Sequence, residues 1–176
     1  MKTPMQIGLV LFLAVDLLSA TETPSSVAEK FCHLEMTGIG LDGRTSGPLL
    51  ELTTGEEEPF SETLEIVSEC KVAQTEPTSS TTADVVVEYS ILGKIREDNL
   101  GLKHILHKKN TEKIRFRLLF VDGNWKISRK SLADVPVHAT AKAWARNFQD
   151  LLNEDNKAHP ALDRNLQEVV AQLTRM

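Results

Sequence analysis

Hydrophobic and polar residues alternate near the middle of the chain, between Lys113 and Lys130. Every second residue from Ile114 to Phe120 is large and apolar, which predicts a β-strand with one buried face. The dipeptide Asp122-Gly123 then favours a two-residue hairpin turn, because such a turn needs positive φ at both central positions. The turn and the apolar pattern agree on a single register, which pairs Phe120 with Trp125 and Leu118 with Ile127 on the same face.

Other segments predict the elements around this hairpin. Two further strands are expected over 66–73 and 84–92, with a turn rich in threonine and serine between them. Polar connections are expected over 96–112 and 134–137, and helices over 24–36, 49–53, 141–152 and 160–173. Together these elements predict an α+β fold, in which N-terminal helices pack on a curved antiparallel sheet of about four strands and a C-terminal helical hairpin follows.

The first 20 residues have the features of a cleaved signal peptide. Lys2 gives a positive start, an unbroken apolar run extends from Ile7 to Val15, and Ala20 is a small residue suited to cleavage before Thr21. The apolar run is too short to span a bilayer. The alternative is a buried N-terminal helix. We expect an exported protein, periplasmic or secreted, with no integral membrane segment after cleavage.

Length and composition indicate one globular domain. The chain has 176 residues, 41% of them hydrophobic, and a net charge of −5, which gives no general attraction to nucleic acid or anionic lipid. We assign the domain to 21–136 and a helical extension to 137–176. Cys32 and Cys70 either form a disulfide in an oxidising compartment or remain buried thiols. They do not make a metal site, because no histidine lies at ligand spacing beside them.

The segment Val121 to Ile127, with the sequence Val-Asp-Gly-Asn-Trp-Lys-Ile, resembles the closing hairpin of the nuclear transport factor 2-like superfamily. The resemblance covers roughly 24–132 and departs from the family pattern at 96–112 and in the tail. It implies a cystatin-like cone, in which a curved sheet wraps the leading helix, and an exported bacterial member of the superfamily. Isomerases, dehydratases, epoxide hydrolases and non-catalytic binding proteins share this fold, so the resemblance leaves the function open.

Enzymes that resemble this pattern place an ionisable side chain inside the cone. The strand phases put no carboxylate and no histidine on the expected inner face, which favours a plain core. That face comprises Ile66, Ser68, Cys70, Val72, Val85, Val87, Tyr89, Ile91, Ile114, Phe116, Leu118, Phe120, Trp125 and Ile127. Tyr89 is its single polar candidate for catalysis or ligand contact, and the alternative is a core tyrosine. His33 on the first helix could enter the mouth of the cone. We expect Tyr89, His33, Phe116 and Trp125 to contact any ligand.

The remaining titratable residues give no catalytic motif. His138 is expected to be a helix-entry residue, and His104 and His107 to be solvated. Glu65 belongs to the acidic segment 51–69, which contains no base. No cofactor and no metal are expected.

Charge is unevenly distributed along the chain. Residues 94–130 contain eleven basic and four acidic residues, and Arg115 is expected to lie opposite Lys130. Acidic residues of the same chain, such as Glu88, Glu69 or the segment 51–69, could neutralise this excess. Alternatively, Arg115, Arg117, Lys126 and Lys130 form a patch for an anionic partner. Nucleic acid is not expected, because interleaved aromatic residues are lacking.

The outer face of the predicted sheet is also apolar, at Val67, Val86, Leu92, Leu119 and Val121. We expect the C-terminal helices to cover it, in the same chain or in a homodimer. The function that these patterns favour is an exported, non-catalytic binding or accessory protein. It would use a cone-shaped pocket or the basic hairpin to bind a small apolar molecule or a protein partner. The alternative is a small-molecule isomerase, dehydratase or hydrolase with its site in the cone.

Overall fold

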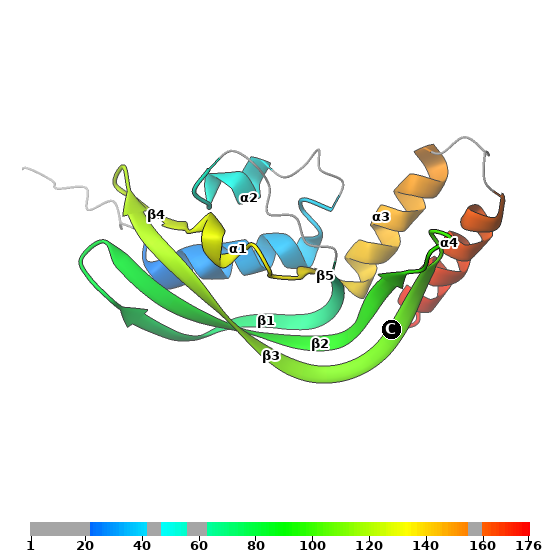
Figure 1. Ribbon diagram of the computed structural model, residues 1–176, viewed down its shortest axis with the longest axis horizontal. Helices are drawn as coiled ribbons and strands as arrows, with labels where there is room; N and C mark the ends of the chain where they lie inside the picture. The colour runs from blue at the N-terminus through cyan, green and yellow to red at the C-terminus, as the bar shows by residue number, and fades with distance from the viewer. Residues whose placement is uncertain (1–21, 42–46, 56–62, 155–159) are drawn as a thin grey trace, which may run out of the picture.

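The computed structural model describes residues 22–41, 47–55, 63–154 and 160–176 (Figure 1). The predicted signal peptide therefore lies outside the described residues. Within them, none of the helices combines the length and apolar character that crossing a membrane requires. The elements are α1 (Pro24–Thr37), α2 (Gly47–Glu51), β1 (Leu64–Pro77), β2 (Thr82–Glu97), β3 (Lys103–Val121), β4 (Asn124–Ile127), the 3₁₀ helix η1 (Arg129–Ser131), β5 (Val137–Thr140), α3 (Ala141–Glu154) and α4 (Pro160–Leu173).

The α+β prediction is confirmed. The sheet is curled and its strand order is β4-β3-β2-β1-β5. Helices α1 and α2 lie on its concave side, while α3 and α4 form a hairpin at one end of the long strands (Figure 1). The sheet differs from the expected one in being mixed, because β5 runs parallel to β1 and adds a fifth strand. Residues 134–137 were expected to be a linker leading into a helix, with His138 at its entry, and a strand as short as β5 has too few residues to show a period of two.

The central hairpin has the predicted register. Phe120 pairs with Trp125 and Leu118 with Ile127, and both turn residues have positive φ, 51° at Asp122 and 81° at Gly123. Leu118 and Ile127 are fully buried, but Phe120, nearer the turn, is 38% exposed. The pair at the tip therefore lies at the margin of the core rather than in it.

The polar connection expected at 96–112 is instead part of a long β2–β3 hairpin. The Asp98 carboxylate accepts hydrogen bonds from the backbone N–H groups of Leu100 and Leu102 and so stabilises its tight turn. Both faces of 106–111 are exposed. Alternation of polar and apolar residues arises only where one face of a strand is buried, so this part of β3 carried no pattern that would predict it.

Irregular pairing in β1 changes which side chains face the concave side. The β1–β2 register shifts between Ile66 and Val67 and again between Val67 and Glu69. Ile66 was assigned to the inner face, yet it packs in a cluster with α3 and α4, whereas Val67 joins the cluster under α1. A β-bulge reverses the inward and outward alternation beyond it, and a pattern with a fixed period of two cannot show this.

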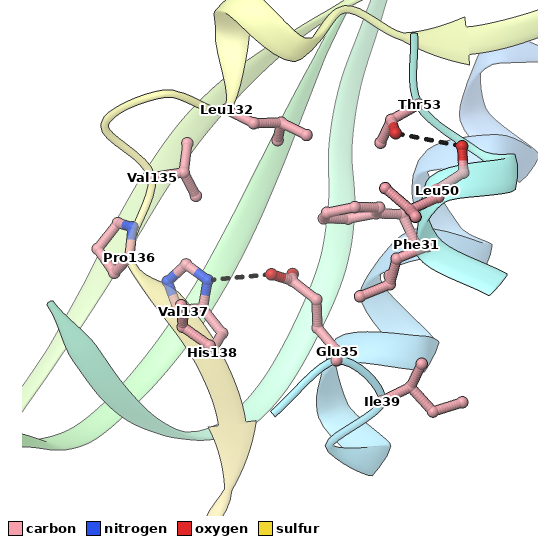
Figure 2. Close-up of a pocket in the computed structure, with 12 residues that line it drawn as sticks. Phe31, Glu35, Ile39, Leu50, Thr53, Leu132, Val135, Pro136, Val137 and His138 are labelled. Atoms are coloured by element: carbon pink, nitrogen blue, oxygen red, sulfur yellow. Dashed lines mark hydrogen bonds and ion pairs between the residues drawn. The ribbon is translucent and has the colours of Figure 1, made fainter. Parts of the chain in front are cut away.

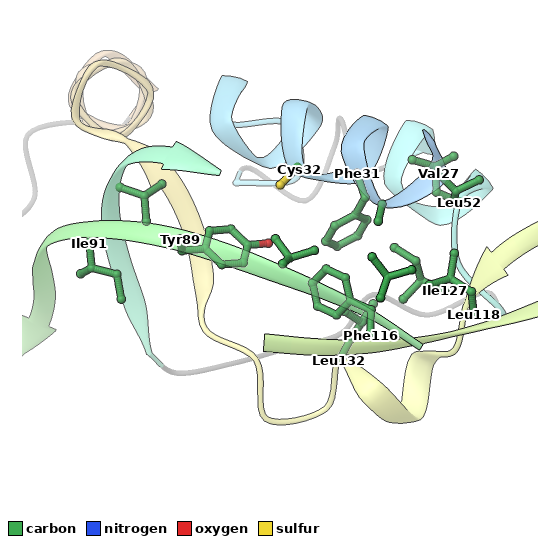
Figure 3. Packing of buried hydrophobic residues seen from close by; sticks show 14 residues of the cluster. Val27, Phe31, Cys32, Leu52, Tyr89, Ile91, Phe116, Leu118, Ile127 and Leu132 are labelled. Carbon is green, nitrogen blue, oxygen red and sulfur yellow. The ribbon is translucent and has the colours of Figure 1, made fainter. Parts of the chain in front are cut away.

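Two apolar clusters hold the elements together. The first lies between α1 and the concave face and includes Phe31, Tyr89 and Phe116 (Figure 3). The second joins Ile66 and Ile95 to the C-terminal helices, whose buried members include Ala143, Trp144, Phe148, Val169 and Leu173. These helices thus cover the curled end of the sheet. Within this chain they do not cover the rest of the outer face, since Val67 lies in the first cluster and Val121 remains 37% exposed.

The bend of the long hairpin provides a test at Gly93. A Cβ atom there would lie 2.8 Å from the backbone oxygen of Leu106, and backbone atoms can move away only by distorting the strand. We predict that Gly93→Ala destabilises the protein by about 1–3 kcal/mol, measured as a lower urea midpoint. Gly47→Ala is the matched control, since no atom of the described residues lies within 4 Å of a Cβ at that position. Equal midpoints for the two variants would contradict the close approach of β2 and β3.

Candidate functional site

A buried carboxylate near the end of α1 organises the candidate site. Glu35 is only 8% exposed. Its Oε2 atom accepts a hydrogen bond of 2.7 Å from the Tyr89 hydroxyl, and its Oε1 atom lies 3.8 Å from Nδ1 of His138. Figure 2 shows the Glu35 carboxylate and the His138 ring pointing toward each other from α1 and β5. The first helix and the edge strand of the sheet thus meet through polar groups.

His138 continues this arrangement into the protein. Its Nε2 atom lies 3.4 Å from Oε2 of Glu65, and Oε1 of Glu65 lies 2.5 Å from the ammonium group of Lys94. The imidazole also stacks on the Tyr89 ring, with centroids 3.9 Å apart and planes inclined by 12°. We call these five side chains, Glu35, Tyr89, His138, Glu65 and Lys94, the buried ionic network. Acidic and basic groups alternate from Glu35 through His138 and Glu65 to Lys94, so each of these charges has an opposite neighbour.

Strand pairing explains why the network assembles. Glu65 on β1 pairs with Lys94 on β2 and with His138 on β5. Both cross-strand neighbours of this carboxylate are therefore basic, and opposite charges directly across a sheet attract. Tyr89 lies further along β2 and reaches Glu35, which α1 carries above the sheet. The indole N–H of Trp144 donates to the backbone oxygen of Glu65 and anchors the same point from α3.

The network changes the ionisation of its members. Burial would lower the pKa of His138, but the Glu35 and Glu65 carboxylates on either side raise it to about 9, so the ring is an imidazolium at neutral pH. Burial would raise the pKa of Glu65, yet His138 and Lys94 lower it overall. Burial, together with the charge of Glu35, holds the pKa of Tyr89 well above its ordinary value. Tyr89 is thus a fixed hydrogen-bond donor.

A cavity of about 70 Å³ lies beside Glu35 and His138. Its walls are mainly apolar and come from α1, α2 and the segment that follows η1; they include Phe31, Ile39, Leu50, Leu132 and Val135 (Figure 2). Thr53 also lines it, but its hydroxyl donates to the backbone oxygen of Leu50. The volume is well below the roughly 300–1,000 Å³ of common small-molecule sites. The cavity thus accommodates a small group.

The four residues expected to contact a ligand are not gathered around this cavity. Tyr89 is linked to it through Glu35. Phe116 lies in the first cluster with its ring 5.6 Å from that of Phe31, and Trp125 is half-buried at the margin of that cluster. His33 is exposed and lies at a separate surface depression with Cys32 and Cys70. Helix α1 therefore turns Glu35, rather than His33, toward the interior.

The expectation of an interior without carboxylates or histidine is wrong, because Glu65 is 0% and His138 is 1% exposed. A usable signal existed only for Glu35, which lies four residues after Phe31 and thus on the apolar face of the helix. Glu65 faces inward because of the β1 irregularity, and His138 is placed by a strand that the sequence pattern did not predict. Among the described residues, no cluster of His, Cys, Asp and Glu is arranged to hold a metal ion.

The cysteine pair and the expected basic patch were the two other candidate features of the sequence. The structure pairs Cys32 with Cys70 in a disulfide that ties α1 to β1, with Cα atoms 5.9 Å apart. Of the expected anionic-partner patch, Arg115 and Arg117 both contact Asp84.

The Arg115–Lys130 pairing is wrong. Strand β4 ends at Ile127, and Lys130 belongs to η1. Arg115 instead faces Val86 on β2, and Asp84 on the same strand reaches it diagonally. Lys126 on β4 pairs with Leu119 on β3, two residues beyond Arg117 and on the same face of the sheet.

The network predicts a pH dependence of stability. The pKa of His138 is about 9 in the folded protein against an ordinary value of 6.5. Protonated His138 therefore stabilises the fold fully below pH 6.5, and this contribution is lost as the pH rises through about 9. We expect the free energy of unfolding, from urea titrations, to fall by about 1–3 kcal/mol over this range.

Two variants isolate the effect. His138→Gln should remove most of the pH slope, while His107→Gln, at an exposed position of β3, should leave it unchanged. If the pH dependence of the unfolding free energy persists in His138→Gln, the proton that is lost between pH 6.5 and about 9 belongs to another group.

Comparison of the chain with protein families, with curated proteins and with solved structures found no match. What the protein does must therefore be inferred from the chemistry of its own residues.

Proposed function

We propose that the protein is an exported, non-catalytic binding protein that holds a small molecule, or the end of a larger one, in the cavity beside Glu35. The observation that carries this proposal is the Glu35 carboxylate at the wall of an otherwise apolar cavity. Binding sites commonly combine apolar walls with a few fixed polar groups that orient the ligand. Tyr89 and His138 fix the carboxylate by contacting one oxygen each.

The polar wall favours a ligand that donates hydrogen bonds. The Glu35 carboxylate accepts hydrogen bonds and carries negative charge, whereas its cationic neighbour His138 is buried and held between two carboxylates. A hydroxyl or ammonium group would therefore be bound, and a carboxylate would meet a like charge. The small volume limits the apolar part to a short chain or branched group.

Export and membership of the nuclear transport factor 2-like superfamily belong to the same proposal. The Cys32–Cys70 disulfide supports an oxidising compartment. A leading helix on the concave side of a curled sheet, closed by the Asp122-Gly123 hairpin, supports the superfamily.

A second candidate is an enzyme that transfers protons, of the isomerase, dehydratase or hydrolase type. The observation in its favour is the continuous contact from Tyr89 through Glu35 to His138 at the cavity wall, since catalytic groups occur where titratable side chains converge. Glu35 would act as the base. Among the described residues that line the cavity, the ionisable side chains are Glu35 and His138, and His138 already lies between two carboxylates, so no further group stands ready to pass the proton on. We therefore prefer binding.

The proposal predicts selective binding of small donors. In ¹H–¹⁵N NMR titrations, butanol and butylamine should shift the amide signals of Phe31, Thr53 and Val135, while butyrate should not. Glu35→Gln should weaken butylamine binding by about tenfold or more, because a charge-assisted hydrogen bond is lost. Glu29→Gln, at an exposed position of the same helix, should have no effect. An absence of shifts at these amides with all three compounds would exclude the cavity as a binding site.

One probe separates the two candidates. Acetone is small, and a base at the cavity wall would exchange its protons for deuterium in D₂O. If the protein only binds, deuterium should enter acetone no faster with the protein than without it. Labelling that disappears in Glu35→Gln would establish proton transfer and overturn the preference for binding.

A further inference from the structure

Most of strand β3 forms an open edge of the sheet. Strand β3 spans Lys103–Val121, but its outer neighbour β4 pairs only with the four residues from Leu118 to Val121. Figure 1 shows that β3 runs along the edge of the sheet and that β4 lies beside it at one end only. Between these ends, no described residue bonds to the outward backbone groups of 105–115. An unpaired edge offers a row of backbone donors and acceptors to another chain.

Both ends of this edge are closed by specific contacts. At one end, the Asn165 side chain accepts from the backbone N–H of Lys103 and donates to its carbonyl oxygen, at 2.7 and 3.0 Å. At the other end, the Arg117 N–H donates to the Ser131 hydroxyl, and the Arg117 carbonyl oxygen accepts from Ser128. The backbone N–H and C=O groups of successive residues in a strand point to opposite sides, so every second residue directs them outward. Arg117 directs its groups outward, and so do Arg115, Lys113 and Thr111, which face the open side.

The side chains beside this edge continue a pattern that crosses the sheet. Lys71 on β1, Glu88 on β2 and Lys113 on β3 are cross-strand partners in one row. Glu88 contacts both lysines, at 2.9 and 3.5 Å. Charges in this row alternate as base, acid and base, and the row ends at Lys113, whose side chain is 63% exposed. An acidic side chain is the residue that would continue the alternation on a further strand.

We propose that this edge binds an extended, acidic segment of a partner protein, which adds to β3 as an extra strand. Main-chain hydrogen bonds to Thr111, Lys113 and Arg115 would supply affinity, and acidic side chains facing Lys113 and Arg115 would supply specificity. Lys108 and Lys109, further along the edge, are exposed and form no ion pair with described residues. They extend the basic surface that such a segment would meet.

A second copy of this chain fits the edge poorly. Pairing two β3 edges would bring the lysine-rich stretch of one copy against that of the other, and like charges across strands repel. Lysines on an open edge keep identical edges apart for this reason. The same charges attract an acidic strand, so the surface discriminates between the two occupants.

The experiment uses a short capped peptide in which glutamate alternates with valine, and a matched peptide with lysine in place of glutamate. Amide hydrogen exchange of Thr111, Lys113 and Arg115 should be fast in the free protein and slow by at least tenfold when the glutamate peptide is saturating. The lysine peptide should not protect them. Fluorescence anisotropy should show that Lys113→Glu lowers the affinity for the glutamate peptide by about tenfold. Lys142→Glu on α3 should leave this affinity unchanged.

Two results would overturn the proposal. Slow exchange of these three amides in the free full-length chain would show that the edge is already covered, by another part of the chain or by a second copy. Binding of the glutamate peptide without protection of these amides would place it elsewhere. Lys113→Glu places two carboxylates opposite each other at Glu88, so its urea midpoint is expected to be lower than that of Lys142→Glu. Equal circular dichroism of the two variants at the assay temperature, well below both thermal midpoints, ensures that lost binding reports on the edge rather than on unfolding.

Discussion

The structure around the candidate site depends on the neutralisation of one carboxylate. Glu65 is completely buried, and an unpaired charge in such a place costs several kcal/mol, on the order of the stability of a whole domain. Two cations on the flanking strands, Lys94 and His138, remove this cost. The parallel strand β5 is therefore tied to β1 by charge as well as by backbone hydrogen bonds. Because His138 also faces Glu35, the same constraint reaches the end of α1 and the cavity beside it.

Strand β1 links the two halves of the core. Its irregular pairing sends Val67 into the cluster under α1 and Ile66 into the cluster under the C-terminal helices. Glu65 lies at the junction, with its side chain in the buried ionic network and its backbone oxygen bound by the Trp144 indole. A change in the packing of α3 is thus expected to alter the site, although α3 contributes no side chain to the cavity walls.

The cavity and the open edge use different physical principles. The cavity is small, mostly apolar and beside a charge that is balanced inside the protein, so a ligand proposed for it would be selected by size and hydrogen bonding. The open edge is solvated and basic, so the partner proposed for it would be selected by backbone pairing and charge. They lie on the concave side and on the rim of the same sheet. The two proposed occupants therefore need not compete.

The amino-acid sequence by itself determined the local parts of this protein. The Asp122-Gly123 turn defines its hairpin because backbone conformation and alternation act within a few residues. Helix α1 begins where Thr23 and Ser26 cap it and ends at Gly38 in the left-handed conformation. The α+β class follows from such elements. The spacing of Glu35 from Phe31 also places it on the apolar face of the helix, although Glu35 was not among the expected site residues.

Only the tertiary structure decided the inside of the site. Glu35, Glu65 and His138 come from three separate segments, and no spacing between them carries information about their contact. The β1 irregularity turned Glu65 inward, and the short strand β5 brought His138 beside it. The long exposed part of β3 was equally hidden, because a strand with two solvated faces has no hydrophobic period. Local patterns specify local backbone, whereas compensation of a buried charge is a property of the assembled fold.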